Sequence, residues 1–206
     1  MLDSIGVAHM LQGNRTTFDS DRCGNSNSAL SLNGGYTQVP SGIFFDTSEF
    51  TVSVWVYPLN MSGAEVKIFD FGNGQSSDNI YFSFQSGSNL KPGLQIYAGT
   101  SQKISLWSST YTLSLSQWQL LTFTFDNTSV NLYINAILKA TLSSNLTLTS
   151  LVRTKNYIGK GNWATNGISW SMLDDLRFYN KSLSRSEIND LMNSNCATTT
   201  TIMNSN

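Results

Sequence analysis

The chain has 206 residues, a formal net charge of −1 and only 12% charged residues, about half the usual share of roughly 25%. Ser, Thr, Asn and Gly supply 31, 20, 21 and 15 positions, so neutral polar groups must cover much of the surface. A chain with so little charge has a weak electrostatic field, which argues against nucleic acid and membrane surfaces as partners. Because 12% of the residues are aromatic, we expect a folded chain of one large domain.

Alternation of apolar and polar residues with a period of two predicts an almost entirely β structure. The strongest run is Phe50 to Tyr57, which ends at Pro58. In chain order, the predicted strands are residues 29–32, 36–39, 50–57, 67–71, 80–85, 93–97, 103–107, 117–126, 129–134, 137–142, 156–159 and 169–179. Turn-forming clusters such as Asn33-Gly34-Gly35 and Asn135-Ala136 separate them and favour antiparallel neighbours.

One short helix is predicted near the C-terminus. Ser184 and Glu187 have the spacing of a capping box, and Ile188, Leu191 and Met192 then fall on one stripe. With ten to thirteen alternating strands before it, the chain is expected to form an all-β, antiparallel two-sheet jelly-roll sandwich. The helix is expected to pack at the edge of this sandwich.

Several sequence motifs follow one another in a fixed order. They lie at residues 29–40, 50–58, 118–126, 130–135, 157–159 and 173–184, the last reading Leu-Asp-Asp-Leu-Arg-Phe-Tyr-Asn-Lys-Ser-Leu-Ser. Together they resemble the laminin-G-like domains of the concanavalin A-like lectin and glucanase superfamily, over roughly residues 20–195. The resemblance implies a jelly roll that recognises carbohydrate or protein ligands. We interpret the Asp-Asp-Leu-Arg run as architectural, with an Asp–Arg pair that fixes a strand.

The reactive groups argue against an enzyme. The family-16-type glucanases of this superfamily need two glutamates on one strand, about 5 Å apart, whereas Glu49 and Glu65 are sixteen residues apart and Glu187 is distant. Asp174 and Asp175 are adjacent on a predicted strand, so their side chains are expected on opposite faces. The single histidine, His9, would have to complete any Ser-His-Asp triad. We therefore expect no catalytic residue, with a glycoside hydrolase as the less favoured alternative.

The best candidate for ligand binding is the Gly/Asn-rich loop at residues 159–167. Trp163, with Asn162 and Asn166 beside it, could stack on a sugar and hydrogen-bond its hydroxyls; alternatively, Trp163 is tucked over the sheet rim. Trp107 and Tyr97 are further candidates, with packing on the sheet as the alternative. The predicted function is a non-catalytic module that binds glycan or extracellular protein ligands through rim loops. The alternative is a structural or protein-interaction spacer without a glycan ligand.

A calcium site is a second possibility that the resemblance raises. Asp78-Asn79 precedes a predicted strand and resembles the Asp-Asn pair that supplies calcium ligands in the pentraxins. Calcium takes six to eight oxygen donors, and the position of the pentraxins' second cluster, residues 161–163, holds no carboxylate. The sequence therefore favours at most one weakly held calcium ion, and a simple polar turn is the alternative.

The ends of the chain indicate how the domain is bounded. Cys23 and Cys196 lie near opposite ends, as expected for a disulfide if the first and last segments lie side by side; two unrelated free thiols are the alternative. We expect one domain over residues 1–195, least firmly defined over 1–20, and a Thr-rich tail or linker at 196–206. Five glycosylation sequons start at Asn14, Asn60, Asn127, Asn145 and Asn180. The possible disulfide and the Thr-rich tail are typical of extracellular proteins. We therefore expect the chain to be part of a longer extracellular or cell-surface adhesion protein, without membrane insertion.

Overall fold

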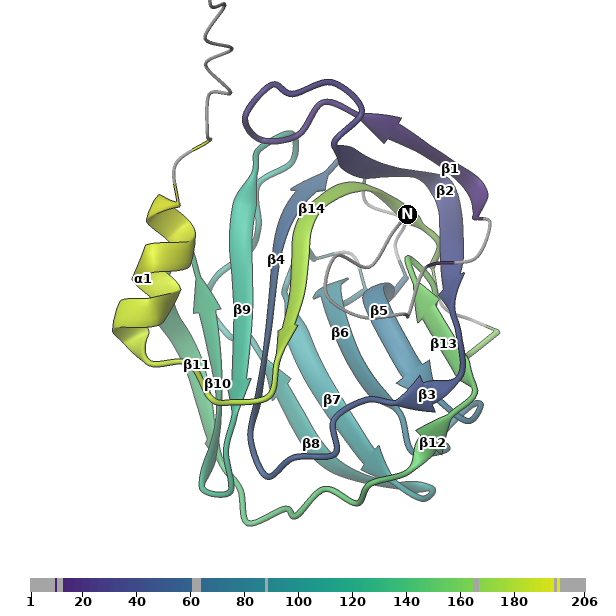
Figure 1. Cartoon of the computed structure of the whole chain (residues 1–206), viewed down its shortest axis with the longest axis vertical. Helices are drawn as coiled ribbons and strands as arrows, with labels where there is room; N and C mark the ends of the chain where they lie inside the picture. The colour runs from purple at the N-terminus through teal and green to yellow at the C-terminus, as the bar shows by residue number, and fades with distance from the viewer. Residues whose placement is uncertain are drawn as a thin grey trace, which may run out of the picture.

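In the computed structural model, the residues described are 10, 13–60, 64–87, 89–164, 167–194 and 196. They form fourteen strands and one helix (Figure 1). The strands are β1 (Asn14–Asp19), β2 (Ala29–Val39), β3 (Gly42–Ile43), β4 (Phe50–Pro58), β5 (Val66–Gly72), β6 (Ile80–Gln85), β7 (Gly93–Ala98), β8 (Ser101–Trp107), β9 (Gln119–Phe125), β10 (Ser129–Ile134), β11 (Ile137–Ser143), β12 (Val152–Arg153), β13 (Lys155–Ile158) and β14 (Ser169–Tyr179), and the helix is α1 (Arg185–Asn193).

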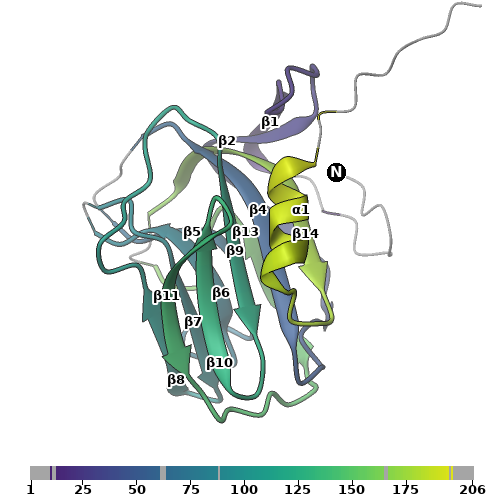
Figure 2. The same cartoon turned by 90° about the vertical axis from the view of Figure 1, so that its left-hand side faces the viewer.

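The strands form two layers that share one strand. The hydrogen-bonded order is β11-β10-β9-β4-β14-β2-β13-β5-β6-β7-β8, with β1 pairing on β2. We call β11 to β2 the first layer and β2 to β8 the second layer; Figures 1 and 2 show them packed face to face. The pairings between these strands are antiparallel. The predicted all-β sandwich with one short C-terminal helix is thus confirmed.

The core lies between the layers and is rich in phenylalanine. Alternate residues of β4 and β9 point inward from the first layer, and those of β5, β6 and β7 point inward from the second. Phe123 and Phe82, one from each layer, meet edge to face at 4.6 Å between ring centroids. Burial of these side chains is the main source of stability, at about 25 cal/mol per Å² of apolar surface. It also leaves every second residue of each strand for the outer faces.

Strand β2 turns the corner between the layers, which corrects the prediction of a turn at Asn33-Gly34-Gly35. Its first half pairs with β14 in the first layer, and its second half pairs with β13 in the second. Gly34 has φ +68°, a conformation that glycine adopts without strain. A Cβ on Gly34 would also lie 2.8 Å from the Trp170 ring. The glycines therefore bend one continuous strand instead of separating two.

Helix α1 begins as predicted, with Ser184 as N-cap and a complete capping box to Glu187. Its Ile188 is fully buried and packs with Ala136 and Leu183, beside Tyr133 of β10 and Tyr179 of β14. Because β9 and β4 lie between those two strands, the helix covers the outer face of the first layer (Figure 2) instead of its edge. The described residues contain no helix long and apolar enough to cross a membrane.

Three strands were not predicted. Strand β1 forms a hairpin-like pair with β2 in the N-terminal stretch, and the two-residue strands β3 and β12 pair with one another. Asn14-Arg15-Thr16-Thr17-Phe18-Asp19 is polar and almost wholly exposed, so its alternation is too weak to indicate a strand. Strands of two residues carry no periodic signal at all.

Candidate functional site

The outer face of the second layer carries a row of polar and aromatic side chains. Across the strands, Tyr157 lies opposite Asp70, which is opposite Tyr81, which in turn is opposite Gln95. Their neighbours along each strand point into the core. Tyr81, Asp70 and Gln95 are nevertheless buried, so something must cover this face.

The cover is the loop that follows β13, the segment predicted to bind ligand. The backbone N–H of Asn162 donates to Asp70 Oδ2 at 2.7 Å, and its side-chain Nδ2 donates to the carbonyl of Lys155 at 3.0 Å. These bonds hold the loop against β5 and β13. Asn162, predicted to contact ligand, therefore uses its amide N–H groups, backbone and side chain, to anchor the loop.

Trp163 follows this anchor and packs on two tyrosines of the sheet. Its ring centroid lies 5.2 Å from that of Tyr81 and 5.8 Å from that of Tyr97, and the two tyrosine rings are stacked at 6.3 Å. Trp163 and Tyr97 both remain half-buried. The structure thus brings two predicted candidates together, and combines the two alternatives for Trp163: the ring is tucked over the sheet and still partly exposed.

A buried lysine lies under the two aromatic rings. Lys67 is only 1% exposed; its Nζ lies 3.4 Å from the Tyr81 centroid and 5.5 Å from the Trp163 centroid. It forms an ion pair with Glu65, which also accepts a hydrogen bond from the Ser83 hydroxyl at 2.9 Å. Burial lowers the Lys67 pKa to about 8, although Glu65 opposes the shift. The cation–π contacts thus stabilise the Tyr81 and Trp163 rings where they meet.

Asp70 is the buried carboxylate of this face. It is fully buried and accepts hydrogen bonds from Asn79 Nδ2 at 2.8 Å and from the Asn162 backbone. Burial raises its pKa, although these hydrogen bonds oppose the shift. Asp70 therefore joins the start of β6 to the loop over the sheet. Neither it nor Lys67 was predicted as a site residue, although a lysine inside the apolar run Val66 to Phe71 was a visible signal.

Trp107 lies on the same outer face, one step away along the strands. It pairs with Gly93, and a Cβ on Gly93 would collide with the Trp107 ring, so the indole packs directly against Gly93 of β7. Beside it, the Gln102 amide donates to the Gln95 side chain. The face therefore holds two half-buried indoles, those of Trp107 and Trp163.

A second aromatic group, which was not predicted, lies beside Asp70 on β2 and β13. The rings of Tyr36 and Tyr157 meet edge to face at 5.9 Å. Lys160 Nζ lies 4.5 Å from the first centroid and 4.8 Å from the second. All three side chains are half-buried. We call Tyr36, Tyr157, Lys160 and the exposed Lys155 the lysine–tyrosine cluster.

Asp78 and Asn79, the predicted calcium ligands, are engaged with different partners. Asp78 Oδ1 accepts from the Gly99 backbone at 2.6 Å, whereas Asn79 is fully buried between Ser77 N and Asp70. The Arg153 guanidinium donates to the Asp78 carbonyl at 2.9 Å, so a cation already lies at this turn. No group of three acidic, histidine or cysteine side chains among the described residues could hold a metal. Asp78 and Asn79 therefore already serve hydrogen bonds of the turn, and a calcium ion at this place stays a prediction.

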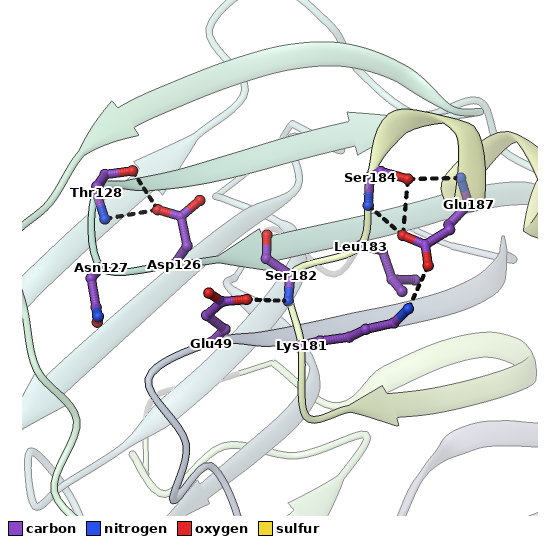
Figure 3. A pocket seen from close by; sticks show the side chains of 9 residues that line it. All are labelled: Glu49, Asp126, Asn127, Thr128, Lys181, Ser182, Leu183, Ser184 and Glu187. Carbon is purple, nitrogen blue, oxygen red and sulfur yellow. Dashed lines mark hydrogen bonds and ion pairs between the residues drawn. The ribbon is translucent and has the colours of Figure 1, made fainter.

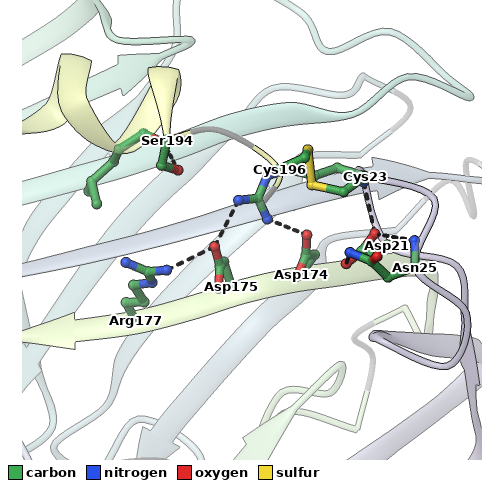
Figure 4. The surroundings of a disulfide bond; sticks show 10 residues. Asp21, Cys23, Asn25, Asp174, Asp175, Arg177, Ser194 and Cys196 are labelled. Atoms are coloured by element: carbon green, nitrogen blue, oxygen red, sulfur yellow. Dashed lines mark hydrogen bonds and ion pairs between the residues drawn. A yellow bond between two sulfur atoms is a disulfide. The ribbon is translucent and has the colours of Figure 1, made fainter. Parts of the chain in front are cut away.

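The predicted disulfide between Cys23 and Cys196 is present (Figure 4). The ion pairs next to it show that Asp174 and Asp175 do not point to opposite faces, as was predicted. Beside the disulfide, Arg22 forms ion pairs with both Asp174 and Asp175. Asp175 has φ +50°, and the β4–β14 register slips there, so both carboxylates lie on one side of the strand instead of opposite faces. Burial raises the pKa of Asp174, although Arg22 opposes the shift. The predicted Asp–Arg pair also exists, between Asp175 and Arg177 at 3.0 Å.

Carboxylates far apart in the sequence converge on a shallow pocket of about 620 Å³ (Figure 3). Its walls come from the start of β4, the β9–β10 turn and the segment before α1, and they hold Glu49, Asp126 and Glu187. Hydrogen bonds from Thr128 and Ser129 outweigh burial and lower the pKa of Asp126. Lys181 and Ser184 lower the pKa of Glu187 to about 2. Both side chains stay ionised and serve the turn and the helix cap, so neither is suited to act as a general acid.

Some predicted positions lie outside the described residues. These are Asn166, His9 and the threonines at 198–201. The asparagines of all five sequons are described and exposed. Two further tryptophans pack on the first layer, Trp55 under the Arg22 guanidinium and Trp118 against Tyr57.

Comparison with known proteins identifies the family of the chain. A family model described as the concanavalin A-like lectin/glucanases superfamily matches residues 31–189. The chain belongs to that superfamily. A search of curated proteins finds no match to this superfamily member.

Solved structures show the same fold at low sequence identity. Domain 4 of AbnA, a GH43 extracellular arabinanase from Geobacillus stearothermophilus in complex with arabinotriose, is 23% identical with a TM-score of 0.67, over 92% of this chain and 91% of that one. The botulinum neurotoxin serotype G binding domain is 17% identical with a TM-score of 0.70, over 92% and 47%. The binding domain of Paraclostridial Mosquitocidal Protein 1 is 21% identical with a TM-score of 0.65, over 91% and 47%. This superfamily domain thus spans nine tenths of the arabinanase domain and under half of the two toxin domains.

Proposed function

We propose that this domain is a non-catalytic recognition module that binds carbohydrate through the outer face of its second layer. The observation that carries the proposal is the half-buried Trp163 ring, held on Tyr81 and Tyr97 above the buried Lys67. An indole fixed in this way loses little conformational entropy when a sugar ring stacks on it. It is a platform that exists before the ligand arrives.

The groups around the platform suit a polyhydroxylated ligand. Gln102 is an exposed amide, hydrogen-bonded to the buried Gln95, and amides both donate and accept hydrogen bonds. Trp107 offers a second apolar ring on the same face. Sugars combine apolar ring faces with hydroxyl groups, so aromatic rings interleaved with amides match them.

The similar proteins support the same class of ligand. The arabinanase domain was solved with arabinotriose, and work on botulinum neurotoxin type C, 16% identical, ties its cell entry to two ganglioside molecules. By analogy, we place this domain in an extracellular or surface protein. The disulfide suits an oxidising compartment, and the five exposed sequon asparagines can carry glycans there.

A glycan array with the purified domain tests the proposal. We expect binding to at least one glycan class, lost or weakened at least tenfold in Trp163→Ala. Trp118→Ala is the matched control, because Trp118 also packs on a tyrosine, Tyr57 at 5.4 Å, but in the first layer. Absence of binding to any glycan, or equal loss in both variants, would refute the site.

A protein-interaction role is the second candidate, and one observation favours it. Ile43 and Val152 pair across β3 and β12 and are 53% and 52% exposed. Two adjacent apolar side chains exposed to this degree suit contact with another protein. If Ile43→Ser abolishes binding to a purified partner while glycan arrays stay empty, this candidate replaces the first.

A further inference from the structure

The lysine–tyrosine cluster, Tyr36, Tyr157, Lys155 and Lys160, differs chemically from the Trp163 platform next to it. Lys160 is held over two aromatic rings, and neither Lys160 nor Lys155 forms an ion pair with any described residue. The other buried or half-buried lysine of this face, Lys67, is neutralised by Glu65. Two positive charges therefore remain uncompensated on a chain whose formal net charge is −1.

The backbone places the four side chains of the cluster on one surface. Lys155 and Tyr157 are alternate residues of β13, so both point outward, while Asn156 and Ile158 between and after them are buried. Tyr36 lies on the neighbouring strand β2, next to the pairing of Thr37 with Ile158. Lys160 follows β13 and folds back over both rings. The ring contacts thus place the Lys160 charge over Tyr36 and Tyr157, and the strand places the exposed Lys155 on the same outer face.

The cluster offers hydrogen-bond donors and almost no negative charge. An ammonium group only donates, and a phenol can donate; neither tyrosine hydroxyl makes a hydrogen bond within the described part of the chain. The carboxylate opposite Tyr157 in register, Asp70, is fully buried and already accepts from Asn79 and Asn162. A ligand at this surface therefore meets ammonium and phenol groups without a competing exposed carboxylate from Asp70.

We infer that the lysine–tyrosine cluster recognises the anionic group of an acidic sugar, so that the glycan bound by this domain carries a carboxylate or a sulfate. The anion contacts Lys160 and accepts from the tyrosine hydroxyls, Lys155 adds positive charge to the same face, and the neighbouring sugar extends towards Trp163. The two rings pre-organise Lys160, which removes much of the entropy that a free lysine loses on binding. This inference rests on the proposed glycan-binding function and names its ligand class.

Matched pairs of oligosaccharides test the inference by calorimetry on the whole domain. The probes are a neutral oligosaccharide, the same oligosaccharide with a terminal sialic acid, and the same with a sulfate. We expect at least tenfold tighter binding of one or both acidic probes, with the two arms showing which anion the cluster prefers. The affinity should fall with added salt, because the contact lies near the surface.

Variants separate the cluster from general charge effects. Lys160→Gln should reduce acidic-probe affinity about tenfold and leave neutral-probe affinity unchanged, as one charge-assisted contact contributes on the order of 1.5 kcal/mol. Lys139→Gln is the matched control, since Lys139 also lies over a tyrosine, Tyr111 at 4.6 Å, but on β11. Tyr157→Phe keeps the ring under Lys160 and removes only the hydroxyl, so it reports on the cluster if Lys160→Gln fails to fold.

The outcomes distinguish this inference from the proposed function. Equal binding of neutral and acidic probes, or equal effects of Lys160→Gln and Lys139→Gln, would overturn the acidic-sugar inference and leave glycan binding in place. Binding of acidic probes that Trp163→Ala abolishes but Lys160→Gln leaves intact would also overturn it. No binding of any probe by the folded wild-type domain would refute both.

Discussion

The ammonium of Lys67 lies 3.4 Å from the centre of the Tyr81 ring, on the outer face of the sheet but covered by the Trp163 loop. Burial lowers its pKa from the ordinary 10.5 to about 8, with Glu65 opposing. Between pH 8 and 10.5 the folded protein therefore releases a proton that the unfolded chain keeps. Because the unfolded state binds more protons in this window, this group makes stability rise with pH.

We predict that the wild type gains stability relative to Lys67→Met as the pH rises from 7 to 10.5. At about 1.4 kcal/mol per pKa unit, the relative gain is on the order of 3 kcal/mol. Urea unfolding at several pH values measures it, and Lys103→Met, an exposed lysine on β8, is the control that should show no such trend. A pH-independent difference between wild type and Lys67→Met would contradict the buried cation.

Arg22 should contribute more to stability than Arg177, although both form ion pairs with Asp175. Arg22 is 13% exposed, lies over Trp55 and also holds Asp174, so Arg22→Met leaves a mostly buried carboxylate unpaired and is expected to cost about 2–4 kcal/mol. Arg177 is 46% exposed, so Arg177→Met is expected to cost at most about 1 kcal/mol. Urea unfolding of the two variants measures both losses of stability. Similar losses would contradict the central role of Arg22 between Asp174 and Asp175.

Removal of the disulfide should destabilise the domain. Cys23 and Cys196 close a loop with a sequence separation of 173, and loss of such a cross-link typically costs about 2–5 kcal/mol through the freedom that the unfolded chain regains. We expect Cys23→Ser with Cys196→Ser to lower the melting temperature while far-ultraviolet circular dichroism stays unchanged. An unchanged melting temperature in the double variant would show that the bond adds nothing.

Calcium should leave the stability of the domain unchanged. Asp78 and Asn79 are occupied by Gly99, Ser77 and Asp70, so we expect millimolar calcium to shift the melting temperature by no more than about 1 °C. Asp78→Asn keeps the acceptor for Gly99 and removes the charge. A calcium-dependent rise in wild type that this variant lacks would establish the ion site instead.

The period of two was enough to predict most strands, because burial on one side of a sheet leaves a direct trace in the sequence. For α1 the signal was different: the capping-box spacing of Ser184 and Glu187 predicted where the helix begins, and the structure confirms the box. The site was only partly predictable. Trp163 and Tyr97 were identified as candidates, but Tyr81 and Lys67 were not. These two residues belong to the site because the loop that carries Trp163 folds over their strands, and strand periodicity contains no information about where a loop folds.

The remaining differences have local physical causes. Two adjacent aspartates on a regular strand would point apart, and it is the positive φ of Asp175 that turns both towards Arg22. Similarly, spacing in the sequence could exclude a pair of glutamates on one strand, but it could not foresee that Glu49 and Glu187 would line one pocket. Backbone irregularities and long-range contacts of this kind become visible only in three dimensions.

The bond between Cys23 and Cys196 also decides how the domain would behave under tension. The two Cα atoms are 5.2 Å apart, so a force pulling on the chain before the first cysteine and after the second would pass across one covalent link. The sandwich between them would carry almost none of that load. Whatever ligand the outer face holds would therefore stay bound to an undistorted surface, even if the domain worked as a tether.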